Sequence, residues 1–294
     1  MARENSKIGI IGAGKLGSSL AATLHAHDQK IVISSRRAER RDWLRDEFPN
    51  ADVVDDYTRI PDNAKIVFIT TTDSAIKEVC DSIDWNPNHW VIHCSGVLTL
   101  DVLETAKSAG ASVAGFHPLQ TFPFDGAQNL FEEISFAIDC QDDDLHSWLQ
   151  DFARTHRSRT FAIEGETAHA AYHASAVLAC GLLAGLIGIS AELWESAGIE
   201  RNRALKMLSP MLQSTIDAIT RDGLPDAISG PYVRGDLATI RQHLQTTAQI
   251  NPDTSRAYAA LALAQIDIAN EKGNLNTNTI NAVKHALTEH LKSL

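Results

Sequence analysis

The feature that most constrains the fold of this chain is a glycine-rich turn within its first twenty residues. A β-branched run at residues 8–11 leads into three glycines, and an alanine-rich helical pattern follows. In this order the first glycine permits a tight turn, the second lets a ligand approach the backbone, and the third lets helix and strand pack closely. The helix N-terminus presents free N–H groups and a positive dipole to an anion. The turn therefore predicts a site for the pyrophosphate of a dinucleotide, formed by Gly12, Gly14, Lys15, Leu16 and Gly17.

Apolar β-rich runs alternate with helical patterns from residue 7 to about residue 161. Such alternation indicates βαβ units, which build a parallel sheet with helices on both faces. The expected strands are 8–11, 30–34, 66–70, 90–93, 112–116, 136–139 and 160–163, and the expected helices between them include 37–48, 74–83, 100–109 and 143–155. We predict an α/β fold with a doubly wound, mainly parallel sheet in the N-terminal part of the chain.

The pattern changes after Glu164 and becomes almost wholly helical. The expected helices are 167–195, 200–221, 237–247, 255–271 and 277–293, separated by glycine, proline and asparagine. We therefore predict two domains, a dinucleotide-binding domain at 1–163 and an all-helical substrate and dimerisation domain at 164–294.

Residues 174–190 are apolar enough to resemble a membrane span. They fall slightly short of the roughly 20 residues that a bilayer requires, and they are flanked by acidic residues with no basic cluster. A helix that is apolar all round is more typical of the buried centre of a helical domain. We expect no membrane contact, and we expect the other helices to wrap this one, including copies from a second subunit in a homodimer formed by the C-terminal helices.

The overall charge and the cysteines limit the classes of function. The chain has 294 residues and a formal net charge of −11, which argues against binding of nucleic acid through its phosphates. Its four cysteines lie far apart without metal-ligand spacing, so we interpret them as small buried residues of a reducing compartment. We expect a cytoplasmic protein whose partner is a small molecule and which holds no metal.

The end of the second expected strand indicates which nicotinamide cofactor binds. NAD-specific proteins usually place an acid there to hold the ribose hydroxyls, whereas this chain has Ser35, Arg36 and Arg37 and no acid before Glu39. Guanidinium groups and a hydroxyl suit a 2′-phosphate, which a carboxylate would repel. We therefore predict NADP(H). The alternative is that these arginines open a solvated helix, which is our expectation for Arg40 and Arg41.

Further candidates follow the ends of the other strands, where ligands of open α/β sheets bind. Thr71 and Thr72 could line the ribose and phosphates, although this segment also suits a helix cap at Asp73 or Ser74. Ser95 and Gly96 suit a close approach to the nicotinamide. His93 and His117 fall where a substrate would lie, and the alternative for each is a structural hydrogen bond.

Two candidate groups lie in the helical part of the chain. Tyr172 and His173 precede the apolar run and need polar partners if they are buried. Arg234 stands before a helix N-terminus, a place suited to a substrate carboxylate, with a surface or subunit salt bridge as the alternative. Asp236 is an N-cap candidate beside it.

Several short sequence segments together resemble those of the Rossmann-like oxidoreductases that carry a C-terminal helical domain named DUF2520. They are the glycine turn and residues 93–96, 116–122, 172–174 and 230–236. This family is distantly related to pyrroline-5-carboxylate reductase, ketopantoate reductase and the β-hydroxyacid dehydrogenases. The resemblance implies a Rossmann domain, a helical dimerisation domain and an NADP-type cofactor. It also implies that residues 234–236 match the loop with which pyrroline-5-carboxylate reductases hold the substrate carboxylate.

One departure from these relatives bears on the reaction. They tend to have a Ser-Asn pair where this chain has Cys180 and Gly181, and β-hydroxyacid dehydrogenases use a lysine and an asparagine on this helix. Neither lysine nor asparagine occurs from Thr167 to Ile199. We therefore expect NADPH-dependent reduction of a C=O or C=N bond in a small carboxylate-bearing molecule. The expected proton donor is His173 or His117, and Arg234 is expected to bind the substrate carboxylate. The residues expected near the substrate are His93, Tyr172 and Asp236. The alternatives are a dehydrogenase acting in the oxidative direction and a non-catalytic NADP(H)-binding sensor or structural partner.

Overall fold

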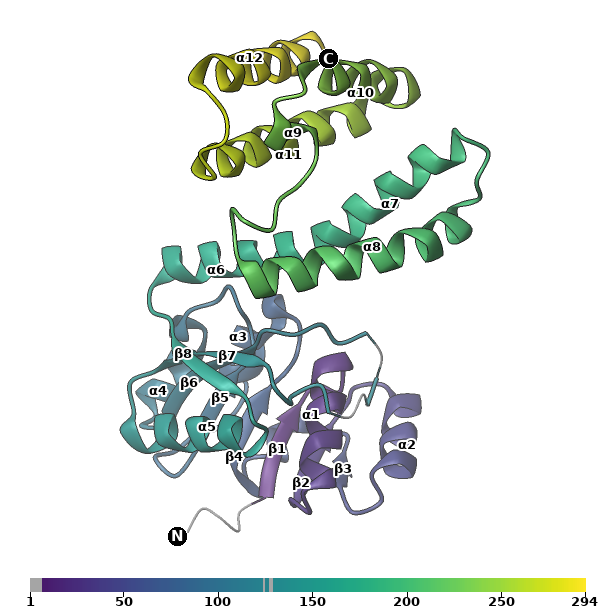
Figure 1. Ribbon diagram of the computed structural model, residues 1–294. Helices are drawn as coiled ribbons and strands as arrows, with labels where there is room; N and C mark the ends of the chain where they lie inside the picture. Colours follow the sequence, from purple (N-terminus) through teal and green to yellow (C-terminus); the bar gives the residue numbers. More distant parts are fainter. Residues whose placement is uncertain (1–6, 124, 127–128) are drawn as a thin grey trace. The chain divides into compact units, whose positions relative to one another are not determined.

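The computed structural model describes residues 7–123, 125–126 and 129–294. The chain divides into two units, Met1–Cys180 and Gly181–Leu294 (Figure 1). The first unit contains the sheet and the helix α6 (Glu166–Ala179), and the second is all-helical. The boundary predicted near residue 163 lies one helix before this division.

The first unit is built on an eight-stranded sheet in the order β3-β2-β1-β4-β5-β6-β7-β8. All neighbouring strands are parallel except β6 and β7. The order 3-2-1-4-5-6 is that of the doubly wound dinucleotide fold, so the predicted fold class is confirmed. The strands are β1 (Lys7–Ile11), β2 (Ile31–Ser34), β3 (Asp52–Val54), β4 (Ala64–Ile69), β5 (Trp90–His93), β6 (Ser112–Pro118), β7 (Ser135–Cys140) and β8 (Arg159–Ala162).

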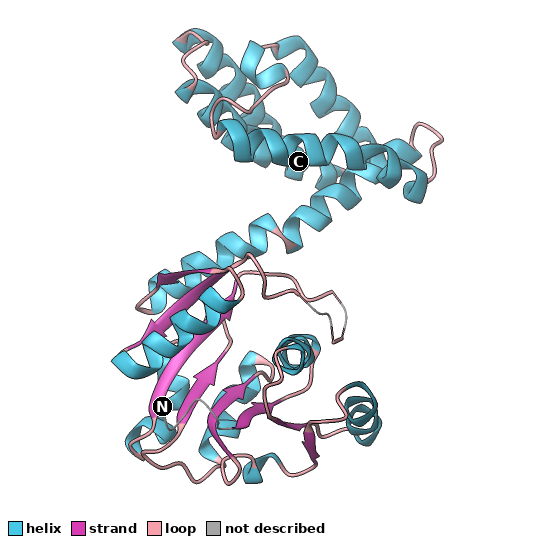
Figure 2. Cartoon of the chain, turned by 60° about the horizontal axis from the view of Figure 1, so that its bottom comes forward, coloured by secondary structure: helices cyan, strands magenta, loops and turns pink. Residues whose placement is uncertain are grey.

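Helices cover both faces of this sheet (Figure 2). One apolar core lies beneath α1 (Lys15–Ala26), α2 (Ala38–Glu47) and α5 (Asp143–Thr155). A second core lies on the opposite face, beneath α3 (Asp73–Asp81) and α4 (Glu104–Ser108). Strands covered on both faces read as continuous apolar runs, which is why most of them could be predicted from the sequence.

Two elements of this unit differ from the prediction. β3 was not expected, because it is a three-residue edge strand too short to show a period. The helix expected at 100–109 is a 3₁₀ turn, η2 (Leu100–Leu103), followed by the short α4. A further 3₁₀ turn, η1 (Tyr57–Arg59), follows β3.

The second unit contains a helical pair and a bundle. The pair is α7 (Gly181–Glu195) and α8 (Arg201–Asp222), and the remaining helices are α9 (Pro231–Arg234), α10 (Leu237–Ile250), α11 (Pro252–Glu271) and α12 (Thr277–Ser293). The apolar core of the unit is formed by α10, α11 and α12, with Ile240, Ile266 and Leu287 fully buried. All five expected helices are present, but the first is divided.

The division falls at Cys180, between α6 and α7, where the backbone leaves helical geometry. The following Gly181 has low helix propensity, which permits the break. Residues 166–195 are the one stretch of the described chain that is long and apolar enough to cross a membrane by length and composition. Only 6% of its most apolar window is buried, so the expectation of a buried central helix is wrong for the single chain.

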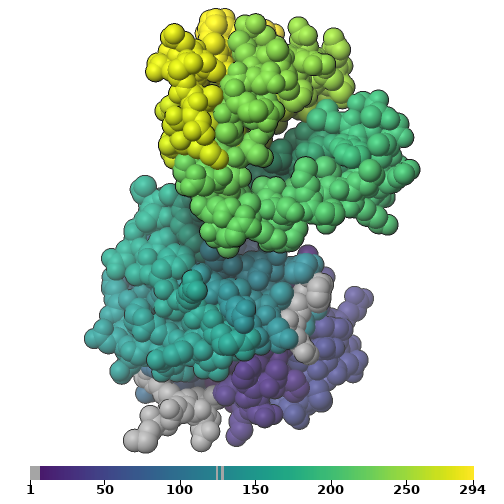
Figure 3. Space-filling view, viewed as in Figure 1, coloured from purple at the N-terminus to yellow at the C-terminus, as the bar shows by residue number. Residues whose placement is uncertain are grey.

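Large apolar side chains of the α7–α8 pair are also exposed to solvent. Part of the surface of this helix pair is visible in the space-filling view (Figure 3). The exposed side chains are Leu182 and Leu186 of α7 and Met207, Met211, Ile216 and Ile219 of α8. Both helices therefore present apolar surface that their own unit does not cover.

Candidate functional site

The glycine turn has the geometry that a bound pyrophosphate requires. A Cβ atom at Gly17 would lie 2.0 Å from the Gly12 carbonyl oxygen, so only glycine lets α1 approach the turn this closely. A Cβ atom at Gly14 would meet no described atom within 4 Å. Protein packing therefore does not require glycine at position 14. A ligand that lies against the open backbone there would require it. The residues present fit a dinucleotide, with Lys15 and Leu16 in the first turn of α1.

The threonines after β4 stand against this turn. Thr70 donates its hydroxyl hydrogen to the Gly12 carbonyl oxygen over 2.6 Å, and a Cβ atom at Gly12 would lie 3.0 Å from Thr71. Thr72 is the N-cap residue of α3, one position before the expected caps. Because the order of strands reverses between β1 and β4, these residues line the crevice where such sheets bind ligands.

Arg40 contacts the glycine turn directly, so the expectation that it is solvated is wrong. Its Nε donates to the Ala13 carbonyl oxygen over 2.8 Å, Nη1 forms an ion pair with Asp125 over 2.9 Å, and the guanidinium lies 4.0 Å from the centre of the Trp43 ring. The side chain is only 10% exposed, and Nη2 is buried with no partner among the described residues. A buried guanidinium with a free donor beside the turn suits a phosphate oxygen.

The other arginines that directly follow β2 differ in exposure and contacts. Arg36 and Arg37 are exposed, and neither guanidinium has an ion-pair or hydrogen-bond partner in the described part of the chain. Arg41 is half-buried, and its Nη1 donates to the carbonyl oxygens of Ser35 and Arg36 over 2.8 and 3.0 Å. Arg41 thereby holds the segment that presents the two free cations.

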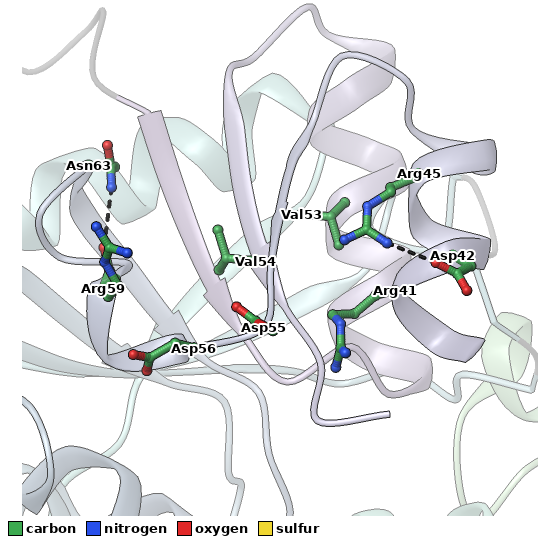
Figure 4. Close-up of a pocket in the computed structure, with 9 residues that line it drawn as sticks. All are labelled: Arg41, Asp42, Arg45, Val53, Val54, Asp55, Asp56, Arg59 and Asn63. Carbon is green, nitrogen blue, oxygen red and sulfur yellow. Dashed lines mark hydrogen bonds and ion pairs between the residues drawn. The ribbon is translucent and has the colours of Figure 1, made fainter. Parts of the chain in front are cut away.

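A surface pocket of about 460 Å³ lies beside this segment, at the β3 edge of the sheet (Figure 4). Its charged lining residues are Arg41, Arg45, Arg59, Asp42, Asp55 and Asp56, three of each sign. Arg45 is paired with Asp42 over 2.8 Å. Because the charges balance, the pocket itself offers no excess positive charge to a phosphate.

At the end of β5, His93 supports the loop that carries Ser95 and Gly96. Its Nδ1 accepts a hydrogen bond from the Ser95 backbone N–H over 3.2 Å, and its ring is fully buried. Burial, with smaller contributions from His169 and His117, lowers the pKa of His93 to about 4. The expected substrate contact does not fit a side chain with no exposed surface, and a structural role does.

His117, Tyr172 and His173 come together beside Gly96. The Tyr172 hydroxyl lies 2.7 Å from His117 Nδ1, and the two histidine rings are 6.1 Å apart. A Cβ atom at Gly96 would lie 2.9 Å from His117 Nε2 and 2.9 Å from His173 Cδ2. Residues from the loop after β5, from β6 and from α6 therefore meet at the end of the sheet where the glycine turn also lies.

Burial dominates the electrostatics of this cluster. It lowers the pKa of His117 to about 4, with a smaller contribution from His173, and it raises the pKa of Tyr172 to about 12. Both groups are therefore neutral at pH 7. His117 can transfer a proton as part of a hydrogen-bonded pair but does not hold a second proton in advance.

Two residues of the same region were not identified from the sequence, Asp139 of β7 and His169 of α6. His169 Nε2 lies 3.2 Å from Asp139 Oδ2, and its Nδ1 lies 3.4 Å from the Gly96 carbonyl oxygen. The available signal was the spacing of His169 and His173, since residues four apart share one helix face. No sequence pattern indicates a role for Asp139, because it resembles any other polar residue at the end of a strand.

Arg234 and Asp236 lie in the second unit, so their place relative to the histidines stays a prediction. Arg234 ends α9 and is exposed. Asp236 caps α10, accepting from the backbone N–H and the hydroxyl of Thr239 over 3.1 and 2.7 Å. These hydrogen bonds lower the pKa of Asp236. Its carboxylate is thus engaged in the cap.

Comparison with known proteins supports this organisation. Residues 7–96 match the family described as NADP oxidoreductase, coenzyme F420-dependent, and residues 134–265 match the DUF2520 domain of unknown function. No curated protein matches the sequence.

Three solved structures share the fold over nearly their whole length. Protein TM1727 from Thermotoga maritima is 21% identical, with a TM-score of 0.73 over 90% of this chain and 99% of that chain. Imine reductase from Pseudomonas sp. is 19% identical, with a TM-score of 0.64 over 97% and 100%. 1-Pyrroline-5-carboxylate reductase from Streptococcus pyogenes is 17% identical, with a TM-score of 0.63 over 95% and 98%.

The glycine turn, the strand order and the two matched domains lead to one assignment. The chain combines an N-terminal domain that matches the family described as NADP oxidoreductase, coenzyme F420-dependent, with a C-terminal DUF2520 domain, on a doubly wound dinucleotide fold.

Proposed function

We propose that this protein is an NADPH-dependent reductase of a C=O or C=N bond in a small, carboxylate-bearing molecule. The observation that carries the proposal is the meeting of His117, Tyr172 and His173 around Gly96, at the carboxyl edge of the sheet that also carries the glycine turn. Bound NADPH would supply a hydride, so the protein must supply position and a proton.

The preference for NADPH over NADH rests on charge at the end of β2. Arg36 and Arg37 are exposed and free, Ser35 adds a hydroxyl, and no acid occupies the strand end. A 2′-phosphate would neutralise these cations through charge-assisted hydrogen bonds. The buried Nη2 of Arg40 adds a donor beside the phosphate turn.

The proton would come from the His117, Tyr172 and His173 group. If His117 carries its proton on Nδ1, it donates to the Tyr172 oxygen, and the Tyr172 O–H is then free to point at a substrate. When Tyr172 gives its proton to the substrate, the Nδ1 proton of His117 would pass to the Tyr172 oxygen while Nε2 takes up a proton from water, so that the imidazole stays neutral. His173 stands beside the pair as the second donor to a developing alkoxide or amine.

The substrate carboxylate would bind Arg234, whose exposed guanidinium has no ion-pair partner in the described chain. We further propose that the protein is a homodimer formed by its C-terminal helices, because α7 and α8 leave large apolar side chains uncovered. The similar structures named imine reductase and pyrroline-5-carboxylate reductase guide the choice of probes towards C=N bonds.

Cofactor binding tests the first half of the proposal. We expect NADPH to bind at least 100-fold more tightly than NADH, since two to three charge-assisted hydrogen bonds recognise the 2′-phosphate. The double variant Arg36→Ala/Arg37→Ala should lose this preference through weaker NADPH binding alone. Arg45→Ala is the matched control, because Arg45 is already paired with Asp42. Equal affinities of the wild type for both cofactors would contradict the NADP assignment.

A turnover screen tests the second half. NADPH absorbance is followed with 1-pyrroline-5-carboxylate, uncharged cyclic imines and small 2-keto acids. We expect oxidation of NADPH with a carboxylate-bearing member, a higher KM in Arg234→Ala, and a kcat reduced about 100-fold in Tyr172→Phe or His173→Ala. Tight NADPH binding without turnover of any probe would favour a non-catalytic sensor.

A further inference from the structure

His169 places both of its ring nitrogens against oxygen acceptors inside the protein. Nδ1 lies 3.4 Å from the Gly96 carbonyl oxygen, Nε2 lies 3.2 Å from Asp139 Oδ2, and the ring is 3% exposed. A carbonyl oxygen can only accept a hydrogen bond, so Nδ1 carries a hydrogen. The tautomer of His169 is therefore determined by its surroundings.

The contact with Asp139 requires one more proton. If Nε2 and Oδ2 were both unprotonated, two lone pairs would face each other in a buried site. One shared proton resolves this, either on Nε2 opposite an ionised carboxylate or on Oδ2 opposite a neutral ring. Burial raises the pKa of Asp139, while the hydrogen bond from His169 acts in the opposite direction.

The surrounding charges favour retention of this proton. Glu164 and Asp101 both raise the pKa of Asp139, and no arginine or lysine of the described chain acts on it. The other titratable neighbours are His93 and His117, both of which are neutral at pH 7. The pair thus has nearby carboxylates but no competing cation.

The position of the pair connects it to the proposed active site. Gly96, whose carbonyl oxygen lies against His169, is the residue that also lies between His117 and His173. Asp139 belongs to β7 and His169 to the first half of α6, so the pair ties the helix to the sheet beneath this loop. A shift of the pair would move the Gly96 carbonyl and the histidines beside it.

We propose that Asp139 and His169 are a positioning pair which shares one proton and holds the Gly96 loop in place at the nicotinamide end of the cofactor site. The loop's role in cofactor binding rests on the proposed function, whereas the shared proton does not. When the proton is lost, the contact becomes repulsive and the loop loses its support. Without this support the loop binds the nicotinamide half of the cofactor more weakly.

The proton can be detected without any ligand. Imidazole ¹⁵N resonances of the full chain are recorded from pH 6.5 to 10, and His169 is assigned from the spectrum of His169→Gln. We expect a proton on Nδ1 at every pH and a pH-dependent Nε2 signal that is absent in Asp139→Asn. The asparagine amide can donate to Nε2 and preserve the geometry but has no proton to lose. His89→Gln, a change in another buried histidine, should leave the His169 signals unchanged.

Positioning is tested with two ligands that differ in the nicotinamide half. In the wild type, NADPH affinity should fall about tenfold as the pair loses its proton, while affinity for adenosine 2′,5′-bisphosphate stays constant. Asp139→Asn should remove this pH-dependent loss, and His169→Gln should weaken NADPH binding at every pH while leaving the bisphosphate unaffected.

The outcomes separate this proposal from the proposed function. An unprotonated Nδ1, or the same His169 titration in wild type and Asp139→Asn, would overturn the shared proton. Equal pH-dependent losses of affinity for NADPH and the bisphosphate would overturn the positioning role. If neither ligand binds at any pH, the cofactor assignment fails and the positioning role fails with it, and the ¹⁵N titration still decides the shared proton.

Discussion

At the scale of single residues, burial rather than residue type decides what the histidines of the first unit can do. His93 and His117 lie at the ends of neighbouring strands and look equivalent in the sequence, yet one ring is fully enclosed and the other reaches Tyr172. Arg40 and Arg41 likewise look like part of a charged surface helix, but Arg40 reaches the glycine turn and Arg41 holds the end of β2. Such roles depend on contacts with residues distant in the sequence.

Burial of His93 predicts acid sensitivity of the fold. Its pKa is lowered to about 4, against roughly 6.5 in the unfolded chain, so the unfolded state binds more protons between these values. The free energy of unfolding should therefore fall as the pH drops through this window. His93→Gln, which keeps an acceptor for the Ser95 N–H, should reduce that loss by about 3 kcal/mol. Denaturant titrations from pH 7 to 4 measure it.

The control for this prediction is His285→Gln, a change in an exposed histidine of α12. It should leave the acid dependence as in the wild type. An unchanged loss of stability in His93→Gln would show that other groups determine acid unfolding.

At the scale of elements, the β1–α1 connection combines a packing role and a binding role in neighbouring glycines. Gly17 allows close approach between α1 and the turn, whereas Gly14 faces open space. The motif alone cannot separate the two roles, because both positions show the same residue.

Substitution of each glycine should separate these roles. Gly17→Ala forces a Cβ atom against the Gly12 carbonyl and should destabilise the protein by about 1–3 kcal/mol. Gly14→Ala meets no described atom, so its thermal stability should stay within about 1 kcal/mol of the wild type while NADPH affinity falls at least tenfold. Thermal unfolding and cofactor titration of both variants measure the difference. Unaltered NADPH binding in Gly14→Ala would place the pyrophosphate elsewhere.

At the scale of the whole molecule, the exposed apolar helices suggest that one chain is not the complete functional unit. The apolar helix predicted at 167–195 was expected to be buried, and the corresponding stretch of the structure, residues 166–195, is largely uncovered in the single chain. A second copy that packs on α7 and α8 would cover this surface and complete a helical core.

The dimer can be tested by charge substitution on the α7–α8 pair. Leu182 and Met211 are 56% and 58% exposed, so lysine at both positions costs a single chain little but places charges in the proposed interface. We expect light scattering to report a dimer for the wild type and a monomer for Leu182→Lys/Met211→Lys. Glu195→Lys adds charge at an exposed polar residue of α7 without removing an apolar side chain, so it is the control for added charge. A monomeric wild type would contradict the dimer proposal.

The sequence by itself determined the features that depend on local pattern. The alternation of apolar strands and helices, the glycine turn and the acid-free end of β2 all act over a few residues, so the fold class could be predicted and a candidate cofactor site could be proposed. Only the tertiary structure decided which side chains share a site. Arg40 reaches the turn from the next helix, and His169 meets Asp139 thirty residues away. These contacts arise because strands distant in the chain end at one edge of the sheet, and no local period records that convergence.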